Sequence, residues 1–218
     1  MSPAERPGFR RVGERQRYDA GFFQVVTGTF VDPQGFTFER ELLRHPGAVC
    51  VVALEDDGRH ILCVRQYRAV IDDEVLELPA GKRDLPGEEP ELCARRELVE
   101  EVGREAARFT ELGRFYNSVG FSDEETYCFL AEGLTETARD AHGVEEQHMT
   151  IERVELAAVG AMVAAGEIVD AKTIIGCSLA SRLLAGREGA TAPGAAPAAQ
   201  AAQAAAPATP PAAPAPAS

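Results

Sequence analysis

The sequence lacks any Cys-x-x-Cys pair, so it offers no ligand spacing typical of a structural zinc site. Its cysteines are odd in number and lie far apart in the chain, at positions Cys50, Cys63, Cys93, Cys128 and Cys177. Most of them have apolar neighbours. This pattern favours free, buried thiols in a reducing compartment over a disulfide framework.

The sequence also lacks an apolar run long enough to span a bilayer, and its first 20 residues are charged without the apolar core of a secretory signal. We therefore expect a cytoplasmic protein. Basic residues are scarce: 22 Lys and Arg stand against 35 Asp and Glu, a net charge of −13. Because general nucleic-acid binding depends on counterion release by basic residues, this balance argues against nucleic-acid and anionic membrane partners. A small anionic substrate stays compatible, since metal ions can supply positive charge.

The segment from Thr191 to Ser218 has no charged and no aromatic residue. Such a segment cannot bury enough apolar surface to offset the entropy of ordering it. We expect residues 189–218 to form a disordered Ala/Pro-rich tail, which acts as a tether. An alternative is that this tail is the working part of an acidic interaction protein.

The rest of the chain divides into an N-terminal strand region at 1–45 and a main domain at 46–188. An Asp-Pro-Gln-Gly turn at 32–35 predicts a hairpin in the first region. Alternating or apolar runs predict strands at Phe22–Phe30, Phe36–Leu43, Ala48–Leu54, His60–Tyr67, Glu74–Leu78, Glu111–Phe115, Thr126–Ala131 and Thr150–Leu156. Helices are predicted at Glu88–Val102, Ala157–Ala165 and Ala171–Leu184. Strands first, one helix in the middle and helices at the end favour an α+β or mixed α/β sandwich.

The middle helix carries an unusual set of acids. Glu97, Glu100 and Glu101 stand at i, i+3 and i+4, so their carboxylates share one side of the helix. Like charges at these offsets destabilise a helix unless a ligand or solvent compensates them. Hard divalent cations prefer oxygen ligands, which makes these residues a candidate Mg²⁺ site. A solvated glutamate-rich surface is the other interpretation of the same pattern.

Further residues around the helix resemble the Nudix hydrolase motif. That motif reads glycine, five residues, glutamate, seven residues, then Arg-Glu-apolar-x-Glu-Glu-x-Gly-apolar. The segment from Glu88 to Gly103 matches it throughout, while six residues separate Gly81 from Glu88 and Arg104 replaces the last apolar residue. The resemblance implies a Nudix-type α/β/α sandwich with a mixed sheet and an N-terminal antiparallel strand region. It also implies Mg²⁺- or Mn²⁺-dependent hydrolysis of a nucleoside diphosphate linked to another moiety.

The resemblance extends across about residues 20–185 to the ADP-ribose pyrophosphatase branch. It rests on Arg65–Arg68, Glu77–Gly81, Gly120–Glu124 and Gly166–Thr173. The branch implies cleavage of ADP-ribose to AMP and ribose 5-phosphate, and often a homodimer with exchanged N-terminal strands. Val119 stands where the branch usually has proline, so two alternatives stay open. They are a nucleotide-sugar or dinucleotide pyrophosphatase of the same family, and a non-catalytic ADP-ribose-binding module.

The resemblance also assigns roles to single residues. The implied metal ligands are the Ala80 backbone with Glu97, Glu100 and Glu101, and Glu88 and Arg96 support them. Glu145 is the expected general base, with Glu146 second, on a loop before a late strand. The expected substrate contacts are Arg65 and Arg68 as phosphate clamps, Glu77, Glu124, and Phe22 as a surface for the adenine ring.

Overall fold

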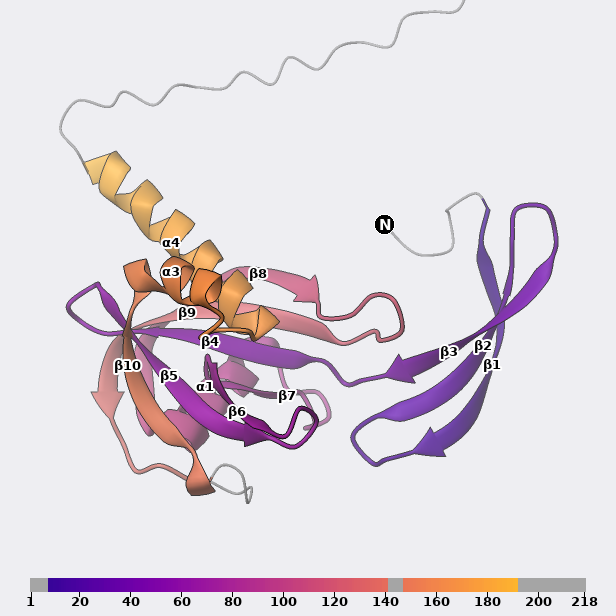
Figure 1. The fold of residues 1–218 in the computed structure, drawn as a ribbon, viewed down its shortest axis with the longest axis horizontal. Coiled ribbons are helices and arrows are strands. Elements are labelled where there is room, and N and C mark those ends of the chain that lie inside the picture. The colour runs from indigo at the N-terminus through magenta and orange to yellow at the C-terminus, as the bar shows by residue number, and fades with distance from the viewer. Residues whose placement is uncertain (1–7, 141–146, 192–218) are drawn as a thin grey trace, which may run out of the picture.

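The computed structural model describes residues 8–140 and 147–191, which form two separate sheets and their covering helices. The small sheet is antiparallel with the order β1-β2-β3 and stands to one side of the main body (Figure 1). Its strands are β1 (Arg10–Asp19), β2 (Gln24–Val31) and β3 (Thr37–Arg44). The predicted turn joins β2 to β3, where the Asp32 carboxylate accepts hydrogen bonds from the backbone of Gln34 and Phe36 at 2.9 and 2.8 Å.

Strand β1 was not predicted from the sequence. It lies at the edge of the small sheet and is exposed along almost its whole length, so its residues show no alternation of polar and apolar side chains. Its strand conformation is held by backbone pairing with β2, for example Arg15 opposite Thr27. Backbone pairing does not require a periodic pattern of side chains, so the sequence does not reveal it.

The main sheet has seven strands with the order β10-β5-β4-β9-β8, while β6 pairs with β5 and β7 pairs with β4. Strands β4 and β9 are parallel and the other pairs are antiparallel. The bounds are β4 (Ala48–Leu54), β5 (His60–Arg68), β6 (Asp73–Glu77), β7 (Ala80–Lys82), β8 (Arg104–Tyr116), β9 (Glu125–Glu136) and β10 (Thr150–Glu155).

The core lies on both faces of strand β4, which is buried throughout. On one face Cys50, Val52 and Leu54 pack with residues of α3 (Val159–Ala165) and α4 (Ala171–Thr191). On the other face the alternate residues Val49, Val51 and Ala53 pack with α1 (Pro90–Val102). The sheet is therefore a middle layer between helices, and the mixed α/β sandwich expected from the sequence is confirmed.

The last helical segments differ slightly from the prediction. The expected helix at Ala157–Ala165 is a short 3-10 turn, η2 (Leu156–Ala158), followed by α3. The following helix α4 continues past the expected end at Leu184 to Thr191. The predicted tail otherwise falls outside the described residues. In the described part of the chain, no helix combines the length and hydropathy needed to cross a bilayer.

The main sheet splits at one place, and this split positions the site. Strands β4 and β5 pair only at Ala53–Leu62 and Leu54–Ile61 before they diverge. Beyond that point β6 continues beside β5 and β7 continues beside β4. The connection from β6 to β7, residues 78–79, therefore crosses the fork, where the Pro79 carbonyl accepts a hydrogen bond from Val51 N at 2.8 Å.

All five cysteines are free and buried, as the sequence predicted. Burial raises the pKa of the Cys63 thiol to about 12, and that of Cys177 is raised for the same reason. A thiol in such surroundings stays protonated and unreactive near neutral pH.

Glu132 of β9 joins three elements, and we expect its replacement by glutamine to weaken the fold. Its carboxylate is bound by Arg108 of β8 and by Arg187 of α4 at 2.8–3.0 Å. Burial raises the pKa of Glu132, but the two arginines lower it by more. Because both arginines are more than a third exposed, we expect Glu132→Gln to cost only about 0.5–1 kcal/mol at pH 7.

The pH dependence of this cost follows from the direction of the shift. A carboxyl group with a lowered folded pKa stabilises the protein above its unfolded pKa of about 4.3, and this contribution disappears as the pH falls through the folded value. Urea unfolding of both proteins should therefore give a constant difference from pH 6 to 8, and the difference should vanish as the pH falls through the lowered folded pKa of Glu132. A difference that grows as the pH falls would contradict the ion-pair assignment.

Candidate metal and substrate site

Helix α1 presents its acids toward the fork in the sheet. Proline at the first helical position starts the helix, and Gly103 ends it with φ 64° while its N–H donates to the Val99 carbonyl at 2.9 Å. Gly103 is therefore the glycine C-cap of α1. Glu97 and Glu101 are buried on this helix, at 7% and 4% exposure, which is unusual for carboxylates and excludes a simply solvated surface.

The strand β7 lies directly against these acids. The Ala80 N–H donates to Glu101 Oε2 at 2.8 Å. Gly81 is closer still, since a Cβ atom at this position would stand 1.8 Å from Glu97 Cδ. Only a residue without a side chain fits there, so the glycine of the motif makes room for the Glu97 carboxylate.

Arg96 links the acids into one group. Its Nη1 donates to Glu97 Oε1 at 2.8 Å and to Glu100 Oε2 at 3.0 Å, while Nε and Nη2 each reach Glu88 at 3.1 Å. The hydrogen bonds from Arg96 lower the pKa of Glu88, and those to Glu88 raise the pKa of Arg96. Arg96 thus holds the carboxylates of Glu88, Glu97 and Glu100 close to one cation. Several carboxylate oxygens next to Gly81, which has no Cβ atom, are suitable ligands for a hard divalent cation.

Two of the residues expected to contact substrate pair with each other. Arg68 at the end of β5 donates from Nε and Nη2 to the two oxygens of Glu77, both at 2.6 Å. Glu77 is 2% exposed, so this is a buried carboxylate with a two-point guanidinium partner. Arg65 makes a similar pair with Glu152 of β10, at 2.5 and 3.2 Å. The sequence indicated these residues but not their partners, which depend on strand register.

Phe22 and Glu124 lie where the small sheet meets the main body. Phe22 packs edge-on against His45 with ring centroids 5.9 Å apart, and Lys82 Nζ of β7 stands 4.7 Å from the Phe22 centroid. The Phe22 ring therefore contacts the residue that follows Gly81 in the chain. Burial lowers the pKa of His45, against the charges of Glu124 and Asp123. The structure thus brings Phe22 beside strand β7 and Glu124 close to His45.

The junction itself is held by the loop between β8 and β9. Leu43 N donates to the Phe121 carbonyl at 2.7 Å, and Arg44 pairs with Asp123 at 2.8 Å. Val119 on the same loop is 78% exposed. The two expected base residues, Glu145 and Glu146, fall outside the described residues.

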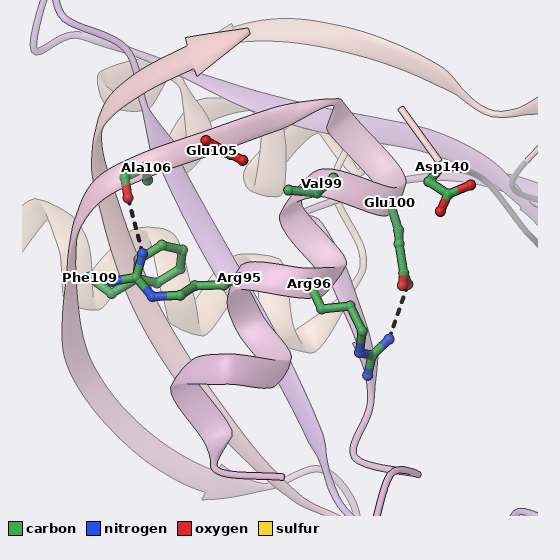
Figure 2. A pocket seen from close by; sticks show the side chains of 8 residues that line it. All are labelled: Arg95, Arg96, Val99, Glu100, Glu105, Ala106, Phe109 and Asp140. Carbon is green, nitrogen blue, oxygen red and sulfur yellow. Dashed lines mark hydrogen bonds and ion pairs between the residues drawn. The ribbon is translucent and has the colours of Figure 1, made fainter. Parts of the chain in front are cut away.

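A cavity of about 490 Å³ opens between α1 and β8, on the side of the helix that carries Glu100. Arg95 lies over the Phe109 ring at 4.3 Å and donates to the Ala106 carbonyl at 3.1 Å. Figure 2 shows that Glu100 and Asp140 both border this space. The cavity could not be predicted from the sequence, because its walls come from segments that only the fold brings together.

A separate acidic group lies at the opposite end of the sheet and contains Glu55, Asp57 and His60, with ligand atoms within 4.8 Å of one another. The Arg153 guanidinium bonds both carboxylates, and Asp57 also bonds His60 at 2.6 Å. The hydrogen bonds from His60 and Arg59 lower the pKa of Asp57. The two carboxylates of this cluster are therefore already paired with Arg153.

The fold and the site together define a class of protein. It is an α/β sandwich whose buried helix carboxylates lie against the strand that contains Ala80 and Gly81. The chain belongs to the NUDIX family, because the NUDIX domain model matches residues 44–174. It is therefore a Nudix hydrolase, and enzymes of this family typically use a divalent metal.

Two relatives and one solved structure are similar to this chain. An ADP-ribose pyrophosphatase of Mycobacterium tuberculosis is 42% identical over 168 residues, covering 77% of this chain and 81% of that protein. An ADP-ribose pyrophosphatase of Bacillus subtilis is 38% identical over 158 residues, covering 69% and 84%. A crystal structure titled as an ADP compounds hydrolase superposes with a TM-score of 0.71 at 22% identity, covering 83% of this chain and 96% of that one. The last comparison supports the fold.

Proposed function

We propose that this protein hydrolyses the diphosphate of ADP-ribose to AMP and ribose 5-phosphate with Mg²⁺, or Mn²⁺ in its place. The observation that carries the proposal is the close similarity over most of the chain to ADP-ribose pyrophosphatases. The buried acids on α1 support it, because Glu97 and Glu101 lie where a metal-dependent hydrolase needs carboxylates.

We assign the metal to Glu97, Glu100, Glu101 and the Ala80 backbone. A bound divalent ion would neutralise charge on the phosphoryl oxygens and favour attack by water. The protein's own residues prepare that place. Arg96 and Glu88 hold the glutamates in position, and the Ala80 N–H fixes one oxygen of Glu101.

We assign Arg65 and Arg68 to the diphosphate, with Glu77 as the residue that orients Arg68. Arg68 uses Nε and Nη2 for Glu77, so Nη1 is not engaged in that pair. Phe22 and Glu124 are assigned to the nucleoside end of the substrate, and Glu145, with Glu146 second, to proton removal from water. Phe22 is 47% exposed, which leaves room for a base to stack on its ring.

We further propose a homodimer in which the small sheet contacts a second copy. The sheet projects to one side of its own main body (Figure 1), and Phe9, Tyr18 and Phe36 in this region are more than 60% exposed. Sedimentation velocity tests this assignment, and a monomer at micromolar concentration would argue against it.

A substrate panel tests the activity. The protein is incubated with Mg²⁺ and ADP-ribose, GDP-mannose or NADH, and nucleoside monophosphate release is measured by chromatography. We expect the highest kcat/KM with ADP-ribose and no release in EDTA. Preference for GDP-mannose or NADH would replace the substrate but keep the reaction. Binding of ADP-ribose without any turnover would instead favour the non-catalytic binding module.

A further inference from the structure

The N-terminus of α4 is tied to the segment that leads from β6 into the site. The Asp170 carboxylate caps the helix by accepting from Thr173 N at 2.9 Å and from Thr173 Oγ1 at 2.8 Å. The Thr173 hydroxyl, which is fully buried, in turn accepts from Leu78 N at 2.9 Å. The backbone immediately after Glu77 is therefore fixed by α4.

Lys172 adds a charge to this connection. Its Nζ lies 2.7 Å from Asp170 Oδ1 and 3.7 Å from Glu77 Oε2, and its side chain is 18% exposed. Burial lowers the pKa of Lys172, but the charges of Asp170 and Glu77 raise it by more, so the ammonium stays charged. Glu77 is thus a buried carboxylate that two cations share, Lys172 on the α4 side and Arg68 on the β5 side.

The Arg68 guanidinium binds Glu77 and is also influenced by the charge of Glu101, one of the candidate metal ligands. Its pKa is raised first by the hydrogen bonds to Glu77 and further by the charges of Glu101 and Asp170. Lys172 offsets part of the charge on Glu77, so it weakens the pull that Glu77 exerts on Arg68. Without Lys172 the Glu77 charge would be balanced by Arg68 alone, which would leave less of the guanidinium charge for an anion in the site.

We infer that Lys172, held by Asp170, is a positioning residue that acts through Glu77 to keep Arg68 available for the substrate diphosphate. This inference rests on the proposed function, because it takes a nucleoside diphosphate as the ligand of Arg68. It adds Lys172 of α4 and the helix-capping residue Asp170 to the residues that affect substrate binding. The proposed role of Lys172 requires only charge balance and hydrogen bonding, with no covalent step.

A double-mutant cycle with Lys172→Met and Glu77→Gln tests the coupling. Calorimetry in EDTA measures ADP-ribose affinity without turnover, and kinetics with Mg²⁺ measure KM and kcat. We expect Lys172→Met to weaken ADP-ribose binding about 10-fold, with KM raised more than kcat is lowered. In the Glu77→Gln background the same substitution should change affinity less than about 2-fold. Lys172→Arg should restore binding.

Arg187→Met is the matched control, because Arg187 is an ion-paired cation on the same helix whose partner Glu132 lies on β9. It should leave affinity unchanged while lowering the melting temperature. Unchanged affinity in a folded Lys172→Met protein, or losses that simply add in the double variant, would overturn the inference. If Lys172→Met does not fold, Lys172→Gln takes its place in the cycle, with the same expectations.

Measurements on the parent protein distinguish a failure of this inference from a failure of the proposed function. If the parent neither binds nor cleaves ADP-ribose, the proposed substrate fails, and the cycle is repeated with GDP-mannose, which carries the same diphosphate group. Coupling between Lys172 and Glu77 with that probe would still support the inference, and additive effects would still reject it.

Discussion

Glu101→Gln is expected to lower Mg²⁺-dependent turnover of ADP-ribose on the order of 10³-fold, a barrier increase of about 4 kcal/mol. The amide keeps the size of the side chain and an oxygen that can accept the Ala80 N–H, so the fold should persist. What disappears is the negative charge that a hard cation requires from its ligand. Glu100→Gln should have a similar direction with a smaller effect, because Glu100 is less buried.

Initial rates over a range of Mg²⁺ concentrations, with Mn²⁺ binding measured in parallel by electron paramagnetic resonance, check this expectation. Glu91→Gln is the matched control, since Glu91 lies on the same helix and pairs with Arg95 at 2.8 Å. The control should retain the activity and metal affinity of the parent. Full Mg²⁺-dependent turnover in both the Glu100 and the Glu101 variants would reject the helix as the metal site.

The local part of this site was predictable because it depends on helix spacing. Glu97, Glu100 and Glu101 follow each other at offsets that any α-helix places on one side, and Gly103 ends the helix by its left-handed conformation. The mixed sandwich was predictable for a similar reason, since its buried strands read as apolar runs. The strand β4, buried at every position, is the clearest of these runs.

The remaining part depends on contacts between distant segments, which a single sequence does not display. The Arg68–Glu77 pair requires β6 to lie beside β5, and the Arg65–Glu152 pair requires β10 on the other edge. The three-residue strand β7 was also missed, because it is too short to show alternation. The pairing of these charges is nevertheless what decides which guanidinium atoms remain for a substrate.

Gly81→Ala is expected to lower turnover about 10²-fold while the protein still folds, and it separates steric from backbone effects. Gly81 is not among the glycines with positive φ, so alanine can adopt its backbone conformation. The new Cβ, however, would lie 1.8 Å from Glu97 Cδ and 2.1 Å from both carboxylate oxygens. Strand β7 is held by pairing of Gly81 with Val49 of β4, so the Glu97 side chain should be the part that moves.

A displaced Glu97 loses its contact with Arg96 and one oxygen position for the cation. We therefore expect the Mg²⁺ concentration for half-maximal rate to rise while KM for ADP-ribose changes little, and overpacking to cost about 1–3 kcal/mol of stability. Gly160→Ala in α3 is the control, because nothing lies within 4 Å of a Cβ atom there. Turnover equal to the parent at limiting Mg²⁺ would show that Glu97 does not need the space beside Gly81. If only the stability were lost, Gly81 would be needed for packing between β7 and α1 and not for metal binding.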